Sequence, residues 1–81
     1  MTTAEKVRKF ITENFYVADK DALTDDASLL DRGIIDSTGV LEVVAFLESE
    51  FGITVDDSEL LPENLDAIGR IAALVEKKKA S

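Results

Sequence analysis

Apolar residues recur at helical spacing in three segments of this chain, and no segment alternates apolar and polar residues as a half-buried strand would. The chain contains neither Cys nor His, so a disulfide or a zinc site of the usual ligands cannot replace a hydrophobic core. A length of 81 residues fits one domain, residues 1–81. The sequence therefore predicts an all-α fold, a small four-helix bundle of three main helices plus one short helix.

The three main helices are predicted at about residues 3–15, at residues 37–51, and from Asn64 or Asp66 onward. Thr2 and Glu5 have the spacing of a capping box for the first helix. Gly52 is a typical left-handed cap for the end of the second. The apolar stripes expected in the core are Val7, Phe10, Ile11 and Phe15; Val40, Val43, Val44, Leu47 and Phe51; and Ile68, Ile71, Ala72 and Val75.

A loop of about twenty residues is predicted between the first two helices, from Tyr16 to Asp36, with a short turn near Ser28. Loops of this length are usually functional or disordered. Five apolar side chains argue against disorder and are expected to anchor the loop to the bundle: Leu23, Leu29, Leu30, Ile34 and Ile35. Farther along, residues 57–61 can form one helical turn, which Pro62 is expected to stop.

The loop ends in Gly33-Ile34-Ile35-Asp36-Ser37, directly before the second apolar-periodic segment. The Ser37 hydroxyl is therefore expected at a helix N-terminus, where unpaired N–H groups and the helix dipole can hold a phosphate group. Serine is also a preferred N-cap, so the pair could serve only to cap the helix. The other serines do not combine exposure, a helix start and a preceding Gly-x-x-Asp: Ser28, Ser49 and Ser58.

Two segments, residues 25–37 and residues 48–53, resemble acyl and peptidyl carrier proteins, and the similarity extends over nearly the whole chain. The resemblance implies that Ser37 carries 4'-phosphopantetheine, added by a phosphopantetheinyl transferase, and that Asp36 contacts this transferase. Thr38 and Gly39 depart from the family, which usually has leucine after the serine. Gly39 suggests the close approach of a partner, a mobile helix start, or drift at a tolerant position.

The resemblance further implies a carrier that holds acyl or aminoacyl groups as thioesters in fatty acid or secondary metabolite biosynthesis. Its expected partners are an adenylating ligase and downstream acyl-using enzymes, as for free-standing carriers. The chain is not expected to be an enzyme, because no His is present to activate Ser37.

The net charge is −8, and no Lys or Arg lies between Arg32 and Arg70. Such a surface would repel nucleic acids and anionic membranes and favour basic protein partners, although acidity can also serve solubility alone. One face of the second helix is expected to dock partners, with apolar residues between acidic ones: Thr38, Leu41, Glu42, Ala45 and Glu48. The alternative function is an unmodified acidic helical adaptor that binds basic proteins.

No metal site is expected: the acidic run that begins at Asp19 lacks the glycine and the closing glutamate of an EF-hand loop. The chain contains neither a 20-residue apolar run nor a signal-peptide pattern. We therefore expect a soluble, cytoplasmic monomer.

Overall fold

The structure, a computed structural model, describes residues 2–17, 19, 21 and 23–80, and for Ser37, Pro62 and Glu63 it describes the backbone alone. The elements in chain order are α1 Thr3–Asn14, α2 Ser37–Phe51, the 3₁₀ turn η1 Asp57–Glu59, α3 Pro62–Leu65 and α4 Ile68–Ala80. The described residues contain helices and turns and no strand. The predicted all-α fold with three long helices is confirmed.

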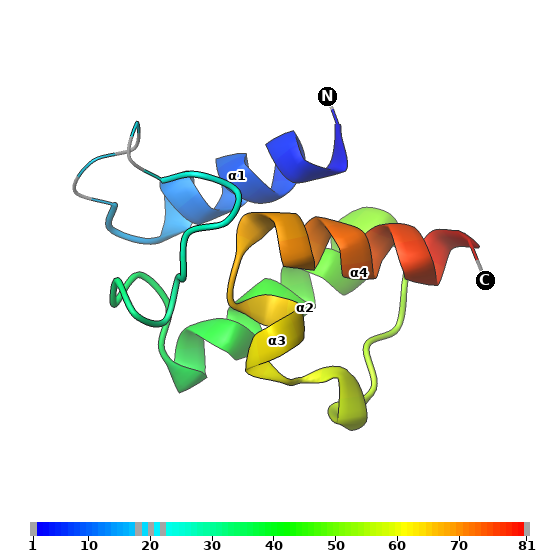
Figure 1. Ribbon diagram of the computed structural model, residues 1–81. Coiled ribbons are helices and arrows are strands. Elements are labelled where there is room, and N and C mark those ends of the chain that lie inside the picture. Colours follow the sequence, from blue (N-terminus) through cyan, green and yellow to red (C-terminus); the bar gives the residue numbers. More distant parts are fainter. Residues whose placement is uncertain (1, 18, 20, 22, 81) are drawn as a thin grey trace.

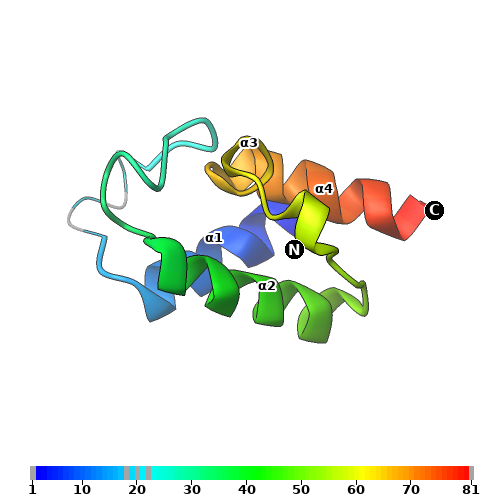
Figure 2. The same ribbon diagram turned by 90° about the horizontal axis from the view of Figure 1, so that it is seen from below.

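Helices α1 and α4 lie side by side and run antiparallel, so that the start of α1 and the end of α4 lie toward the same end of the bundle (Figure 1). The Thr3 hydroxyl donates a hydrogen bond to the Glu76 carboxylate and joins the start of α1 to the last turns of α4. Helix α2 lies below this pair, and the long loop between α1 and α2 closes the opposite end (Figure 2). Ser37, at the start of α2, therefore lies at the end of the bundle away from the termini.

Both predicted helix signals act as expected. The Thr2 side chain accepts a hydrogen bond from the Glu5 amide while the Glu5 carboxylate accepts one from the Thr2 amide, which completes the capping box of α1. Gly52 ends α2 with φ 66°, the left-handed conformation that glycine adopts without steric cost.

The segment before α4 differs from the prediction. The expected helical turn at residues 57–61 is the 3₁₀ turn η1, and it ends at Glu59. Pro62 begins α3 instead of stopping the preceding turn. The fixed φ and missing N–H of proline suit the first position of a helix, where the amide has no intrahelical partner.

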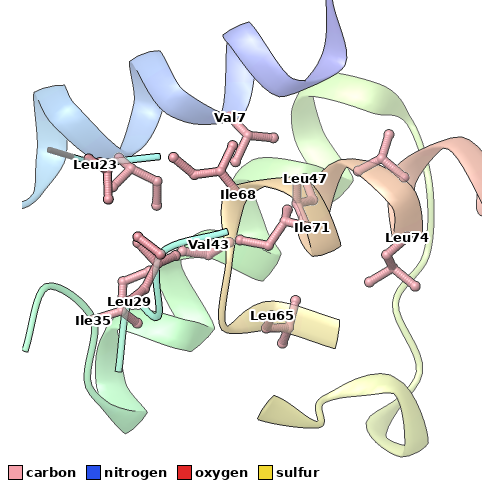
Figure 3. Packing of buried hydrophobic residues seen from close by; sticks show 13 residues of the cluster. Val7, Leu23, Leu29, Ile35, Val43, Leu47, Leu65, Ile68, Ile71 and Leu74 are labelled. Atoms are coloured by element: carbon pink, nitrogen blue, oxygen red, sulfur yellow. The ribbon is translucent and has the colours of Figure 1, made fainter. Parts of the chain in front are cut away.

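The core forms one cluster to which α1, α2, α3, α4 and the long loop all contribute (Figure 3). Its buried members are Val7, Ile11, Leu23, Ala27, Leu29, Ile35, Val43, Leu47, Leu65, Ile68, Ile71, Leu74 and Val75. The loop is anchored as predicted through Leu23, Leu29 and Ile35. Leu30 does not anchor it, because that side chain is 37% exposed.

Aromatic side chains join α1 to α2. The ring of Phe10 stacks on that of Phe46 at a centroid distance of 4.1 Å, and Phe10 also meets Phe15 edge to face at 6.0 Å. Stacked and edge-to-face pairs add to the free energy gained from burial alone. The aromatic contacts therefore fix how the end of α1 sits over α2.

Candidate functional site

Asp36, rather than Ser37, caps α2. Asp36 has extended backbone angles, and its Oδ1 accepts a hydrogen bond from the Gly39 amide at 2.8 Å. Ser37 follows as the first residue with helical backbone. The interpretation of Ser37 as a simple N-cap is therefore wrong: the cap is supplied by the residue before it. The Ser37 hydroxyl itself lies outside the described part of the chain.

A hydrogen-bonded turn brings the chain to this position. The Leu29 carbonyl accepts from the amides of Ile34 and Ile35, at 3.0 and 3.3 Å. Gly33 closes the turn with φ 69°, which L side chains rarely adopt. Leu29 and Ile35 are buried, so the turn is held by the core on both sides. Ser37 therefore follows a segment whose backbone is fixed.

The start of α2 can hold an attached phosphate group. The first amides of a helix have no intrahelical partner. Asp36 occupies the Gly39 amide, and by helix geometry the amides of Ser37 and Thr38 still point out of the helix end. Asp36 and Thr38 are both exposed, so a group on Ser37 would be attached at the surface. The residues at this position thus fit a covalently attached phosphate ester.

Four of the five residues of the predicted docking face are exposed on α2. Thr38, Leu41, Glu42 and Ala45 are exposed along one side of α2, and Leu41 is 61% exposed. Glu48 is half-buried, and its Oε2 accepts a hydrogen bond from the Val55 amide at 3.0 Å. The Glu48 carboxylate therefore binds the segment after α2. The position of Glu48 on the helix did not predict this contact.

Two polar contacts that hold the long loop were not predicted. The Arg8 guanidinium bonds to the Leu23 carbonyl and, at 2.6 Å, to the Asp25 carboxylate. The Asp66 carboxylate accepts from the Ser28 hydroxyl, 38 positions earlier in the chain. Neither pair has a spacing that marks it in the sequence, because Arg8 and Asp66 lie outside the loop and meet it only in the folded chain.

Positive charge gathers at the far end of the bundle from Ser37. Lys6 of α1 and Lys79 of α4 both lie over the Phe51 ring, 5.6 and 5.9 Å from its centroid. Such cation–π contacts hold the ammonium groups against the last turn of α2. Helix α2 itself contains no Lys or Arg, which fits partners that bring basic groups to its exposed side.

In the part of the chain that the structure describes, no group of three or more potential ligand side chains could hold a metal ion. None of the described helices is both long enough and apolar enough to cross a membrane.

Comparison with known proteins gives consistent matches. Residues 5–75 match the family model described as phosphopantetheine attachment site. The chain is 38% identical over 73 residues to an acyl carrier protein of Thermotoga maritima, covering 90% of this chain and 86% of the relative. It is 29% identical over 75 residues to the probable acyl carrier protein PigG of a Serratia species, covering 93% and 86%.

Two solved structures share the fold of this chain. The solution structure of the holo acyl carrier protein NE2163 from Nitrosomonas europaea superposes with a TM-score of 0.77 at 29% identity and full coverage, 100%, of both chains. A chain in a crystal structure described as an FAD-dependent dehydrogenase gives a TM-score of 0.68 at 25% identity, covering 90% of this chain and 97% of that one.

Proposed function

Because the chain belongs to the acyl and peptidyl carrier protein family, we propose that Ser37 is the residue to which its phosphopantetheine group is attached. Members of this family are carriers whose prosthetic group is phosphopantetheine, and the chain itself is not an enzyme. The group supplies, when bound, a terminal thiol on which an acyl or aminoacyl group can be held as a thioester. The Cys-free chain has no thiol of its own for this task.

The position of Ser37 carries the proposal. Ser37 is the first helical residue of α2, follows the capping Asp36, and ends a turn fixed through Leu29. A phosphopantetheinyl transferase would bring coenzyme A and Mg²⁺. The Ser37 hydroxyl oxygen would then form a bond to the phosphorus that bears pantetheine, lose its proton to the transferase, and release adenosine 3',5'-bisphosphate. Asp36 stands beside Ser37 at the surface, where it can meet basic or metal-bound groups of the transferase.

The carrier family implies contact with biosynthetic enzymes, and we propose that these partners dock on the exposed side of α2. Leu41 and Ala45 supply an apolar centre and Glu42 a charged edge, close to Ser37. Thr38 borders the same strip. Glu48 contributes its charge to the rim, while its carboxylate also supports the segment at Val55.

The clients that we propose are an adenylating ligase and enzymes that act on the tethered group. The chain in the structure described as an FAD-dependent dehydrogenase is covered almost end to end by this one, so it has the size of a carrier. This likeness supports a flavin-dependent dehydrogenase as one client class. We also propose that residues 1–81 work as a single carrier domain, monomeric and cytoplasmic. The contiguous core of the described residues supports the single domain.

Mass spectrometry tests the proposal. After incubation with coenzyme A, Mg²⁺ and a broad-specificity transferase, the protein should gain the mass of one phosphopantetheine. Ser37→Ala should gain nothing, and Ser49→Ala, which alters an exposed serine farther along α2, should gain the group as the wild type does. An acidic adaptor that needs no modification would gain nothing in any form, and that result would overturn the proposal.

A further inference from the structure

Asp66, which lies just before α4, makes an unusual number of contacts with the loop between α1 and α2. Its carboxylate accepts from the Ser28 hydroxyl at 2.9 and 2.7 Å and from the Leu30 amide at 2.9 Å. Its main-chain carbonyl accepts from the Leu29 amide at 2.6 Å. Three consecutive loop residues are therefore held by one half-buried residue of a distant segment.

The same three residues begin the turn that ends at Ser37. Ser28 and Leu30 accept, through their carbonyls, the amides of Arg32 and Gly33 at 3.1 and 3.0 Å. The Leu29 carbonyl accepts the amides of Ile34 and Ile35. Ile35 is followed directly by the cap Asp36 and then by Ser37. A continuous set of hydrogen bonds thus runs from Asp66 through the turn to the start of α2.

The Ser28 hydroxyl is shared within this set. It donates to the Asp66 carboxylate and accepts from the Asp31 amide at 3.1 Å. The bond from Ser28 to Asp66 therefore fixes the first residue of the turn and orients the hydroxyl that accepts from the Asp31 amide. Hydrogen bonds to a charged carboxylate are stronger than those between neutral groups, so the bonds to the Asp66 carboxylate are expected to be stronger than the backbone bonds of the turn.

We propose that Asp66 is a positioning residue for the modification of Ser37, acting through residues 28–35 rather than by contact with the reacting atoms. The inference rests on the proposed attachment at Ser37. A transferase must bring a fixed phosphorus atom to the Ser37 oxygen, so a shift in the backbone that precedes α2 misplaces the nucleophile. A displacement of about 1 Å can lower the rate of a positioned reaction by up to about 10²-fold.

The test is steady-state kinetics with the carrier as the varied substrate, coenzyme A as the donor and a broad-specificity transferase. Asp66→Ala should lower kcat about tenfold or more and change KM less than about threefold, because the docking face on α2 is untouched. Asp66→Asn keeps the shape, an acceptor for Leu30 and a donor toward the Ser28 oxygen, and should stay within about threefold of the wild-type kcat. In nitrogen-15 NMR spectra, the amides of Ile34, Ile35 and Gly39 should move in the alanine variant and return in the asparagine variant.

A control separates positioning from loss of stability. Val75→Ala thins the core farther along α4 and should lower the melting temperature without lowering kcat at a temperature where it is folded. If Asp66→Ala does not fold, Ser28→Ala removes the hydroxyl contact to Asp66 together with the acceptor of the Asp31 amide, and it should lower kcat severalfold. A wild-type kcat in the Asp66→Ala or Ser28→Ala variant, an equal loss in Val75→Ala, or an equal loss in Asp66→Asn would overturn the inference. A wild type that is not modified at all would instead overturn the proposed function.

Discussion

The ring of Phe15 lies 3.0 Å from the position that a Cβ atom would take at Gly39. Cγ2 of Ile35 lies 3.3 Å from the same position, and Gly39 is buried at the start of α2. Of the two residues that depart from the family pattern after Ser37, Gly39 therefore faces the protein's own interior, whereas Thr38 is exposed. The close approach that this glycine permits is made by the end of α1, so partner recognition and a mobile helix start are not needed to explain it.

We predict that Gly39→Ala does not stabilise the protein, although alanine is favoured over glycine in helices by up to about 1 kcal/mol. Overpacking against Phe15 and Ile35 costs typically about 1–3 kcal/mol. The net loss should be about 1 kcal/mol, a fall in melting temperature of about 4–8 °C followed by circular dichroism. In a Phe15→Ala background the ring is gone and the Ile35 contact remains, so Gly39→Ala should cost clearly less than in the wild-type background. A stabilised single variant would contradict the contact.

The cap assignment gives a second prediction: substitution of Asp36 should lower stability, whereas substitution of Ser37 should prevent modification. Asp36→Ala removes the acceptor of the Gly39 amide and should cost about 0.5–2 kcal/mol in the free energy of unfolding. Ser37→Ala should abolish modification and change stability by less than about 0.5 kcal/mol, since Ser37 lies one residue past the cap. Chemical denaturation measures the first effect and mass spectrometry the second. An equal loss of stability in both variants would contradict the assignment.

The sequence predicts the long helices well because their signals are local. The Thr2 capping box, the terminating Gly52 and the apolar stripes each act within a few residues of one another. The short elements are predicted less well. Pro62 can end one turn or begin the next, and the choice depends on where the chain must go to reach α4.

The site likewise combines a feature that local sequence predicts with contacts that it does not predict. The serine at the head of α2 is predicted from its loop and helix, which are neighbours in sequence. The bond from Val55 to Glu48 and the bonds from loop residues to Asp66 join segments that meet only in the folded bundle. Such contacts leave no periodic pattern in the sequence. From the sequence alone, the half-buried Glu48 cannot be distinguished from the exposed acidic residues of α2.

The third prediction tests the docking face with Glu42 rather than Glu48. Glu42→Lys reverses an exposed charge beside Leu41 and should raise the KM for modification severalfold, because an exposed ion pair is worth about 0.2–1 kcal/mol and the reversed charge also repels. Glu50→Lys makes the same change in the last turn of α2 and serves as the control. Added salt should bring the wild-type KM toward that of Glu42→Lys, since exposed charges are screened. Equal KM values for both variants, unaffected by salt, would show that the acids serve solubility.

The turn η1 is tied to α4 by an ion pair between Glu59 and Lys78, whose Oε1 and Nζ atoms lie 2.6 Å apart. The hydrogen bond from Lys78, and after it the one from the Asp56 amide, hold the pKa of Glu59 below its ordinary value of 4.5. The bond to Glu59 correspondingly raises the pKa of Lys78 above 10.5. The contact therefore links stability to pH.

The fourth prediction follows from the sign of the Glu59 shift. A carboxyl group whose pKa is lower in the folded state stabilises the protein above its unfolded pKa, and that contribution is lost as the pH falls through the folded pKa. Glu59→Gln should therefore melt at a lower temperature than the wild type at pH 7. The gap should narrow as the pH falls below about 4.5 and then through the lowered pKa of the folded state, where the wild-type carboxylate takes up a proton. Asp57→Asn, which removes an exposed carboxylate from the same turn, is the control and should show a smaller gap at pH 7. Melting curves that keep the Glu59→Gln gap constant from pH 7 down to pH 3 would show that the ion pair adds no pH-dependent stability.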